Sequence, residues 1–81
     1  MQVTVLLFAR LREVVGEGHV QLELPPGADA AAAFAALAAV SPELVPMRPR
    51  VRCAVAGEYA AWDTVLEDGA ELALIPPTAG G

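Results

Sequence analysis

The hydrophobic pattern of residues 1–24 predicts two strands with a short helix between them. Residues 2–8 are apolar and β-branched almost without interruption, which is typical of a strand buried in the interior of a sheet. Good helix formers fill 9–15 and stop at Gly16, where we expect a helix of about two turns to end. Residues 19–24 alternate strictly and predict a half-buried strand whose apolar side chains face inward: Val20, Leu22 and Leu24.

The strongest helix signal in the chain covers 30–40. Asp29 precedes it and can cap its first turn through a side-chain oxygen. Phe34 and Leu37, together with Ala38, recur at helical spacing and predict the buried face. Ser41 and Pro42 close the segment, because a residue before proline avoids the helical conformation.

The second half of the chain predicts shorter elements. Pro46 and Pro49 lead us to expect an irregular stretch before a strand at 51–56. A short strand at 59–62 is expected next, and then a turn or single helical turn and the tight turn signal of 67–69. The last strand covers 70–75, and two prolines end it because proline cannot donate to a ladder.

Strands and helices in this order predict the α+β class, with a mixed sheet of four to five strands and helices packed on one face. The 81 residues are enough for one domain and one core. We expect a globular body over 1–76 and a flexible C-terminal tail over 77–81.

The charge balance removes several classes of partner. Ten acids against five arginines, with no lysine, give a net charge of −5. Nucleic acid is not expected as a partner, because phosphate binding needs a basic footprint. No secretory signal and no membrane-length apolar run is visible, so a cytoplasmic location is the default. Arg48, Arg50 and Arg52 are interpreted as an ordinary solvated strand edge.

Independent catalysis finds little support in the residue types. His19 is the only histidine, so a histidine metal cluster is excluded. Cys53 is the only cysteine and is interpreted as a small buried side chain. A phosphate loop needs a lysine, which the chain lacks. We therefore expect no active site, no metal and no bound cofactor in this chain alone.

The C-terminal segment differs in kind from the rest. Pro76 and Pro77 favour an extended exit from the sheet, and four residues follow them: Thr78, Ala79, Gly80 and Gly81. Two terminal glycines without Cβ atoms could enter a narrow tunnel in another protein. The alternative is a frayed glycine end with no function.

Three segments make the chain similar to a known family: 8–13 (Phe-Ala-Arg-Leu-Arg-Glu), 63–69 and the Pro-Pro-x-x-Gly-Gly end of 75–81. In order, spacing and length they resemble the small, sulfur-carrying subunit of molybdopterin synthase. Two positions depart from the family pattern. Ala56 stands in Val55-Ala56-Gly57 where the family often has asparagine, and Ala70 stands where it often has an acid.

The resemblance implies the ubiquitin-like β-grasp fold, with the first and last strands paired in parallel at the sheet centre. It also implies that an adenylating (E1-like) enzyme activates Gly81 with ATP. A sulfur donor, such as a cysteine desulfurase system, would then convert Gly81 to a thiocarboxylate. The large synthase subunit would accept this sulfur for the cyclic pterin precursor, within a heterotetramer.

The same resemblance assigns roles to single residues. Gly81 would carry the sulfur, Gly80 would allow passage through the tunnel, and the thread before them would bind the partner: Pro76, Pro77, Thr78 and Ala79. Phe8 could dock the partner or belong to the core. The acids of the last third could steer a basic partner or only keep the protein soluble: Glu58, Asp63, Glu67, Asp68 and Glu71.

Three other functions stay open. The chain could carry sulfur for thiamin or for tRNA thiolation. It could be a ubiquitin-like modifier conjugated through Gly81 to lysines of other proteins. It could also be an interaction module without chemistry at its tail.

Overall fold

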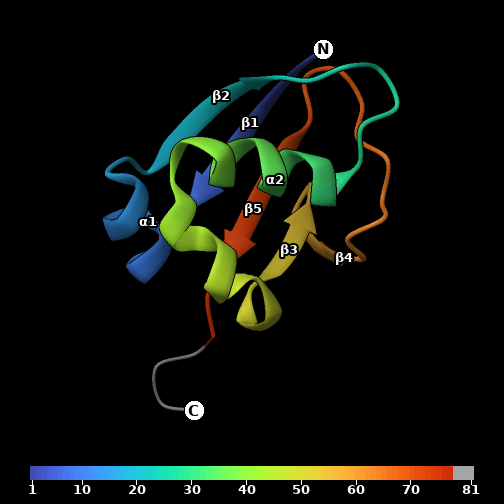
Figure 1. Ribbon diagram of the computed structural model, residues 1–81. Coiled ribbons are helices and arrows are strands. Elements are labelled where there is room, and N and C mark those ends of the chain that lie inside the picture. The colour runs from blue at the N-terminus through green and yellow to red at the C-terminus, as the bar shows by residue number, and fades with distance from the viewer. Residues whose placement is uncertain (78–81) are drawn as a thin grey trace.

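The computed structural model describes residues 1–77, which form one five-stranded mixed sheet and the helices packed on it (Figure 1). The strands lie in the order β2-β1-β5-β3-β4. Their bounds are Gln2–Leu7 for β1, His19–Glu23 for β2, Arg52–Val55 for β3, Glu58–Ala60 for β4 and Glu71–Ile75 for β5. The helices are α1 (Ala9–Val15), α2 (Ala30–Val40) and the 3₁₀ helix η1 (Pro42–Arg50).

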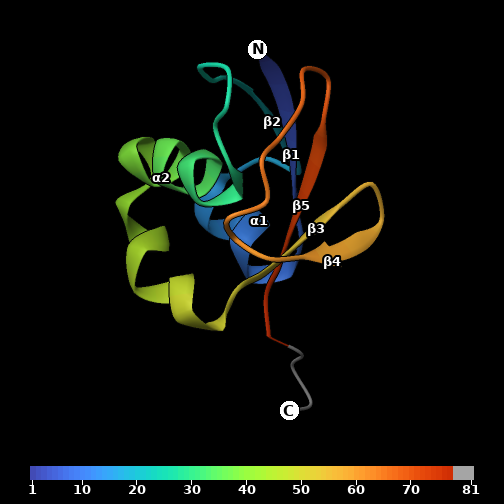
Figure 2. The ribbon, with the colours of Figure 1, turned by 90° about the vertical axis from the view of Figure 1, so that its right-hand side faces the viewer.

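The first and last strands pair in parallel, and the other neighbours pair antiparallel. Leu7 of β1 lies opposite Leu74 of β5, and β5 is the middle strand of the five. Figure 2 shows the sheet nearly edge-on with the helices on one side of it. The predicted α+β class and β-grasp topology are confirmed.

One face of the sheet is covered and the other is open. In β1, Val3, Val5 and Leu7 are buried against the helices, whereas Thr4 and Leu6 between them are only half-buried. The interior position predicted for this strand is confirmed. The expectation that it is buried on both faces is wrong, because the helices cover only one side.

Helix α2 has the predicted bounds and the predicted cap. The Asp29 carboxylate accepts a hydrogen bond from the Ala32 amide at 2.8 Å, which satisfies one unpaired donor of the first turn. Phe34 and Leu37 point into the core together with the small residues of that face: Ala30, Ala33 and Ala38.

The stretch 42–50 is a 3₁₀ helix, so the expectation of irregular structure there is wrong. Proline has a fixed φ that suits a helical turn, and short 3₁₀ segments tolerate a missing donor better than a long α-helix does. Leu44 is fully buried and attaches the segment to the core. Arg48 lies 3.6 Å above the Trp62 ring, and Trp62 meets the Phe34 ring edge-to-face at 5.5 Å. These contacts attach the end of η1 to α2 and to the turn that follows β4.

The remaining local predictions match closely. Helix α1 ends at Gly16, whose φ of 93° suits glycine. Strands β3 and β4 join through a two-residue turn at Ala56 and Gly57, with φ of 53° and 84°. Among residues 1–77 no helix is long and apolar enough to cross a membrane.

Candidate functional site

The root of the C-terminal tail, Ile75 with Pro76 and Pro77, is the candidate site. Ile75 is the last residue of β5 and lies opposite Arg52 of β3. The two prolines that follow lack the amide donor that would continue the ladder, which explains why the strand ends there. Ile75 and Pro76 are half-buried and Pro77 is exposed. The sequence therefore directs the chain away from the sheet at a fixed point.

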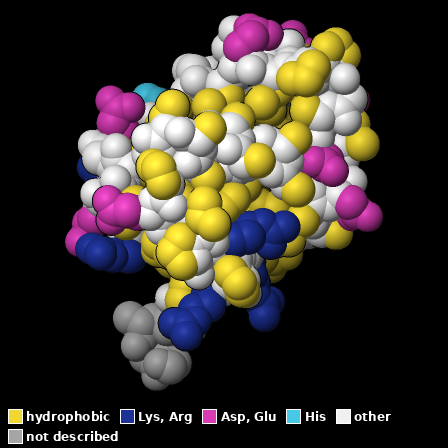
Figure 3. All heavy atoms as spheres, in the orientation of Figure 1, with side chains coloured by type: hydrophobic (Ala, Val, Ile, Leu, Met, Phe, Trp, Pro, Cys, Tyr) yellow, Lys and Arg dark blue, Asp and Glu magenta, His cyan; other side chains and the backbone are white. Residues whose placement is uncertain are grey.

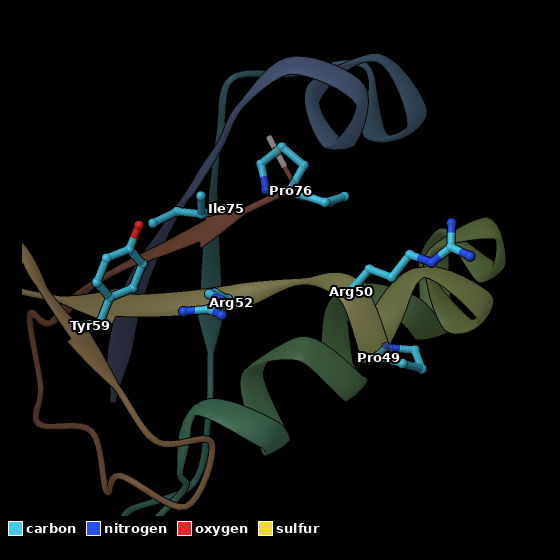
Figure 4. A pocket seen from close by; sticks show the side chains of 7 residues that line it. Pro49, Arg50, Arg52, Tyr59, Ile75 and Pro76 are labelled. Atoms are coloured by element: carbon cyan, nitrogen blue, oxygen red, sulfur yellow. The ribbon is translucent and has the colours of Figure 1, made fainter. Parts of the chain in front are cut away.

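A hollow of about 740 Å³ lies on one side of this root. Its lining comes from three parts of the chain: Pro49 and Arg50 of η1, Arg52 and Tyr59 of the β3–β4 hairpin, and the root itself. In Figure 4, Arg52 lies on β3 between Tyr59 and Arg50, and the Tyr59 ring lies near Ile75. Within residues 1–77 neither Arg50 nor Arg52 forms an ion pair.

A second hollow of about 360 Å³ lies against the same prolines. It is lined by Ala9 and Arg10 of α1 and by Pro46 and Met47 of η1, and it shares Arg50 with the first hollow. The tail root therefore stands between α1 and η1 on one side and the β3–β4 hairpin on the other.

A row of residues crosses the open face near the root. Tyr59 pairs with Ala54, Ala54 with Ala73, and Ala73 with Leu6, so these four side chains cross β4, β3, β5 and β1 on one face. We call them the open-face row. Tyr59 is 69% exposed, whereas Leu6 and Ala73 are half-buried and Ala54 is buried.

Phe8 extends this apolar face toward the tail. It continues the extended backbone of β1, with φ −126° and ψ 152°, so its side chain points to the same face as Leu6. It is 48% exposed and caps the start of α1. Of the two alternatives left open by the sequence, the structure excludes a core position for Phe8. Its role in docking stays a prediction.

The interpretation of Arg48, Arg50 and Arg52 as an ordinary solvated strand edge is wrong. Only Arg52 lies in a strand, and β3 has neighbours on both sides. Arg48 stacks on Trp62, whereas Arg50 and Arg52 line the hollow at the root. Sequence reasoning missed the site that they form with Tyr59. The closely spaced arginines just before a strand were the one sign of this site in the sequence. The sequence alone does not show that Arg52 lies beside Ile75, because that contact depends on the register of β3 on β5.

Charge is distributed unevenly over the molecule. Figure 3 shows dark blue arginine side chains at the lower end, where β5 ends, and magenta acids over the upper end and the sides. Of the acids considered for steering, Asp68 accepts a hydrogen bond from the Gln2 amide at 2.7 Å, and Glu71 lies beside Thr4. Both are at the opposite end of β5 from the root.

The single cysteine is buried, as predicted, and the single histidine lies on the surface. Cys53 is 1% exposed, and its Sγ donates to the Ala60 carbonyl oxygen at 3.2 Å. Burial raises the pKa of the Cys53 thiol, and the nearby Arg48 charge opposes part of that rise. His19 is exposed at the start of β2. Residues 1–77 contain no group of three metal-ligating side chains of the His, Cys, Asp or Glu type.

The four residues predicted to carry the chemistry lie outside the described part of the chain: Thr78, Ala79, Gly80 and Gly81. Their roles therefore stay predictions. The structure describes the point from which they continue, at Pro77.

Comparison with known proteins gives a consistent result. The family model described as the ThiS family matches residues 5–81. The chain is 35% identical over 81 residues to the molybdopterin synthase sulfur carrier subunit of Arabidopsis thaliana, covering all of this chain and 84% of that protein. It is 37% identical to the protein of the same name from Chlamydomonas reinhardtii, with both chains fully covered. Among solved structures, SAMP1 from Haloferax volcanii superposes with a TM-score of 0.89 at 30% identity, and both chains are fully covered.

Proposed function

Because the chain belongs to the ThiS family, we propose that it is the sulfur-carrier subunit of a molybdopterin synthase, and that Gly81 carries the sulfur. The observation that carries this proposal is the match over residues 5–81, which includes both the fold and the Gly80-Gly81 end. Two relatives named as sulfur carrier subunits of this enzyme agree with it over their full alignment with this chain.

The chemistry proceeds at the Gly81 carboxylate in two steps. A carboxylate oxygen attacks the α-phosphorus of ATP on the adenylating enzyme, and pyrophosphate leaves. In the second step, a persulfide of the sulfur donor attacks the carbonyl carbon of the acyl-adenylate, and AMP leaves. A second thiol then cleaves the S–S bond of the resulting acyl disulfide, which leaves the thiocarboxylate on Gly81 and a disulfide between the donor and that thiol. ATP belongs to the adenylating enzyme.

This chain contributes position to the chemistry. Pro76 and Pro77 have fixed φ angles, so they set the direction in which the thread leaves the sheet. Gly80 and Gly81 lack side chains and allow the thread to pass close to the backbone of a partner. The large synthase subunit would supply the acid, the base and the contacts to the pterin precursor.

The open-face row and Phe8 form the surface that would dock the large subunit. The row crosses β5 at Ala73, two residues before Ile75 at the root. An exposed apolar face next to a reactive terminus is typical of an interaction surface. Docking there would hold the thread at the entrance of the partner's active site.

A one-residue extension tests whether the chemistry depends on tail length. Adding alanine after Gly81 moves the reacting carbonyl by about 3.5 Å, whereas errors near 1 Å can lower a rate by about 10²-fold. We expect the urea unfolding curve to be unchanged and sulfur transfer to the pterin precursor, followed by product mass, to fall at least about 10²-fold. A Glu17→Ala variant with the tail unchanged is the control, because Glu17 is exposed in the bend after α1. Full transfer by the extended protein would contradict the proposal.

The pathway is tested by co-purification. A stable complex with the large synthase subunit from the same organism supports molybdopterin synthesis. A complex with a thiazole synthase or a tRNA-thiolating enzyme instead would assign the carrier to thiamin or tRNA sulfur.

A second candidate function is favoured by one likeness. SAMP1 from Haloferax volcanii is named as a small archaeal modifier protein, so the chain could also be joined to other proteins through Gly81. The chain contains no lysine, so copies of it could not be linked to one another through lysine. Higher-mass adducts that disappear when Gly81 is deleted would support conjugation to target proteins.

A further inference from the structure

We infer that the hollow lined by Arg50, Arg52 and Tyr59 binds carboxylate side chains of the large subunit that accepts the tail. The inference rests on the proposed function and adds the chemistry of the partner surface. It predicts an acidic segment on the large subunit where it meets the tail root.

The charge of the hollow favours an acidic partner. The protein as a whole carries a net charge of −5, yet two arginines line this one hollow. Within residues 1–77 neither forms an ion pair, whereas Arg10 lies 3.5 Å from Glu13. Guanidinium groups bind carboxylates through two parallel hydrogen bonds, which fixes orientation as well as charge. A carboxylate from a partner would supply the anion that the described part of this chain does not provide.

The combination of a tyrosine with arginines in the hollow favours a protein as its partner. Tyr59 is 69% exposed and presents its ring to the same hollow as Arg52 (Figure 4). Tyrosine and arginine are the residues most often found to anchor protein interfaces, because each combines apolar area with hydrogen-bond donors. Tyr59 also begins the open-face row. A bound protein can contact the row and the arginines together, which a free phosphate cannot do.

The hollow lies beside the root of the tail. Pro76 and Pro77 form part of the hollow's wall, so any protein that encloses the tail passes over Arg50 and Arg52. Attraction between exposed charges reaches about 10 Å at 0.1 M salt, so the arginines would act during encounter as well as in the complex. They would orient the carrier so that its tail faces the partner's entrance.

The experiment measures the association rate of the unextended carrier with the large synthase subunit of the same organism. Arg52→Ala is compared with Arg12→Ala, which removes the same charge from α1, outside the hollow. At about 0.05 M salt we expect Arg52→Ala to slow association several-fold, and Arg50→Ala/Arg52→Ala about tenfold. Arg12→Ala should change it less than about twofold, and at about 1 M salt all the rates should converge. Arg52→Lys should recover the rate but leave dissociation faster than in the wild type, since lysine lacks the bidentate geometry.

Each other outcome decides against the inference. Equal effects of Arg52→Ala and Arg12→Ala on the association rate would show that only the overall charge of the protein matters and that the hollow is not a specific binding site. Displacement of the large subunit by pyrophosphate, beyond that by chloride at equal ionic strength, would make it a phosphate site. If wild-type protein binds the large subunit and the double variant binds equally well, only this inference fails. If wild-type protein does not bind at all, the proposed function fails with it. Thermal unfolding of each variant identifies losses caused by misfolding.

Discussion

The two ends of the middle strand β5 differ in their contacts with the rest of the chain. At the Glu71 end, the Thr4 amide donates to the Ala70 carbonyl oxygen at 2.9 Å, and the Gly69 amide donates to the Gln2 carbonyl oxygen at 2.7 Å. At the Ile75 end, two prolines follow and hollows lie on both sides.

The comparison separates stability from binding. The Glu71 end is closed by hydrogen bonds within the chain, so its residues serve the fold. The Ile75 end presents guanidinium groups and apolar side chains that residues 1–77 leave available to a partner. Both ends belong to the same strand, so docking of the open face would set the position from which the tail begins.

The largest effect should come from substituting neighbours at the Ile75 end. Leu74 is fully buried and Ile75 lies half-buried on the opposite face. Leu74→Ala should lower the free energy of unfolding by about 2–5 kcal/mol, because it leaves a cavity in the core. Ile75→Ala should lower it by less than about 1 kcal/mol and weaken binding of the large subunit instead. Urea unfolding and a binding titration measure the two effects. Equal losses of stability would contradict the separation.

A smaller effect is expected for two arginines near this end. Arg48 lies over the Trp62 ring, so Arg48→Ala should cost about 1 kcal/mol of unfolding free energy. Arg52→Ala should cost less than about 0.5 kcal/mol, since Arg52 is exposed and forms no ion pair with residues 1–77. Thermal unfolding of both variants at one pH tests the contrast. The reverse order would place Arg52 in the fold and Arg48 in the interface.

The smallest effect should be a gain. Ala56 has a φ of 53° in the β3–β4 turn, a conformation that asparagine adopts more readily than alanine. Ala56→Asn should raise the free energy of unfolding by about 0.5 kcal/mol. Because the turn lies away from the tail root, binding of the large subunit should not change. Ala60→Ser, in the same hairpin but outside the turn, is the control. A destabilised Ala56→Asn protein would show that the turn is not strained.

The elements could be predicted from sequence because local signals agree with the fold. Asp29 caps α2 as expected, and the helix covers the predicted range, 30–40. The 3₁₀ helix was missed because Pro46 and Pro49 exclude an ordinary α-helix but not a tighter one. The turn geometry suits the asparagine that the family often has at this position, because the φ of 53° at Ala56 is one that asparagine adopts readily.

The candidate site could be predicted only in part. Pro76 and Pro77 identified the tail root, because proline acts on its own backbone wherever it lies. The hollow could not be found, since Arg52 and Ile75 become neighbours only through the register of β3 on β5. Exposure of Phe8 likewise depends on where α1 begins, which the pattern located without showing which way the ring points.

Intact mass of the protein tests the central claim most directly. After incubation with the adenylating enzyme, ATP and a sulfur donor, the account predicts a gain of about 16 Da at Gly81, as sulfur replaces one carboxylate oxygen. A Gly81-deleted protein should show no gain under the same conditions. An unchanged mass for the full chain, with an adenylating enzyme shown to be active on another carrier, would contradict the claim that this chain carries sulfur.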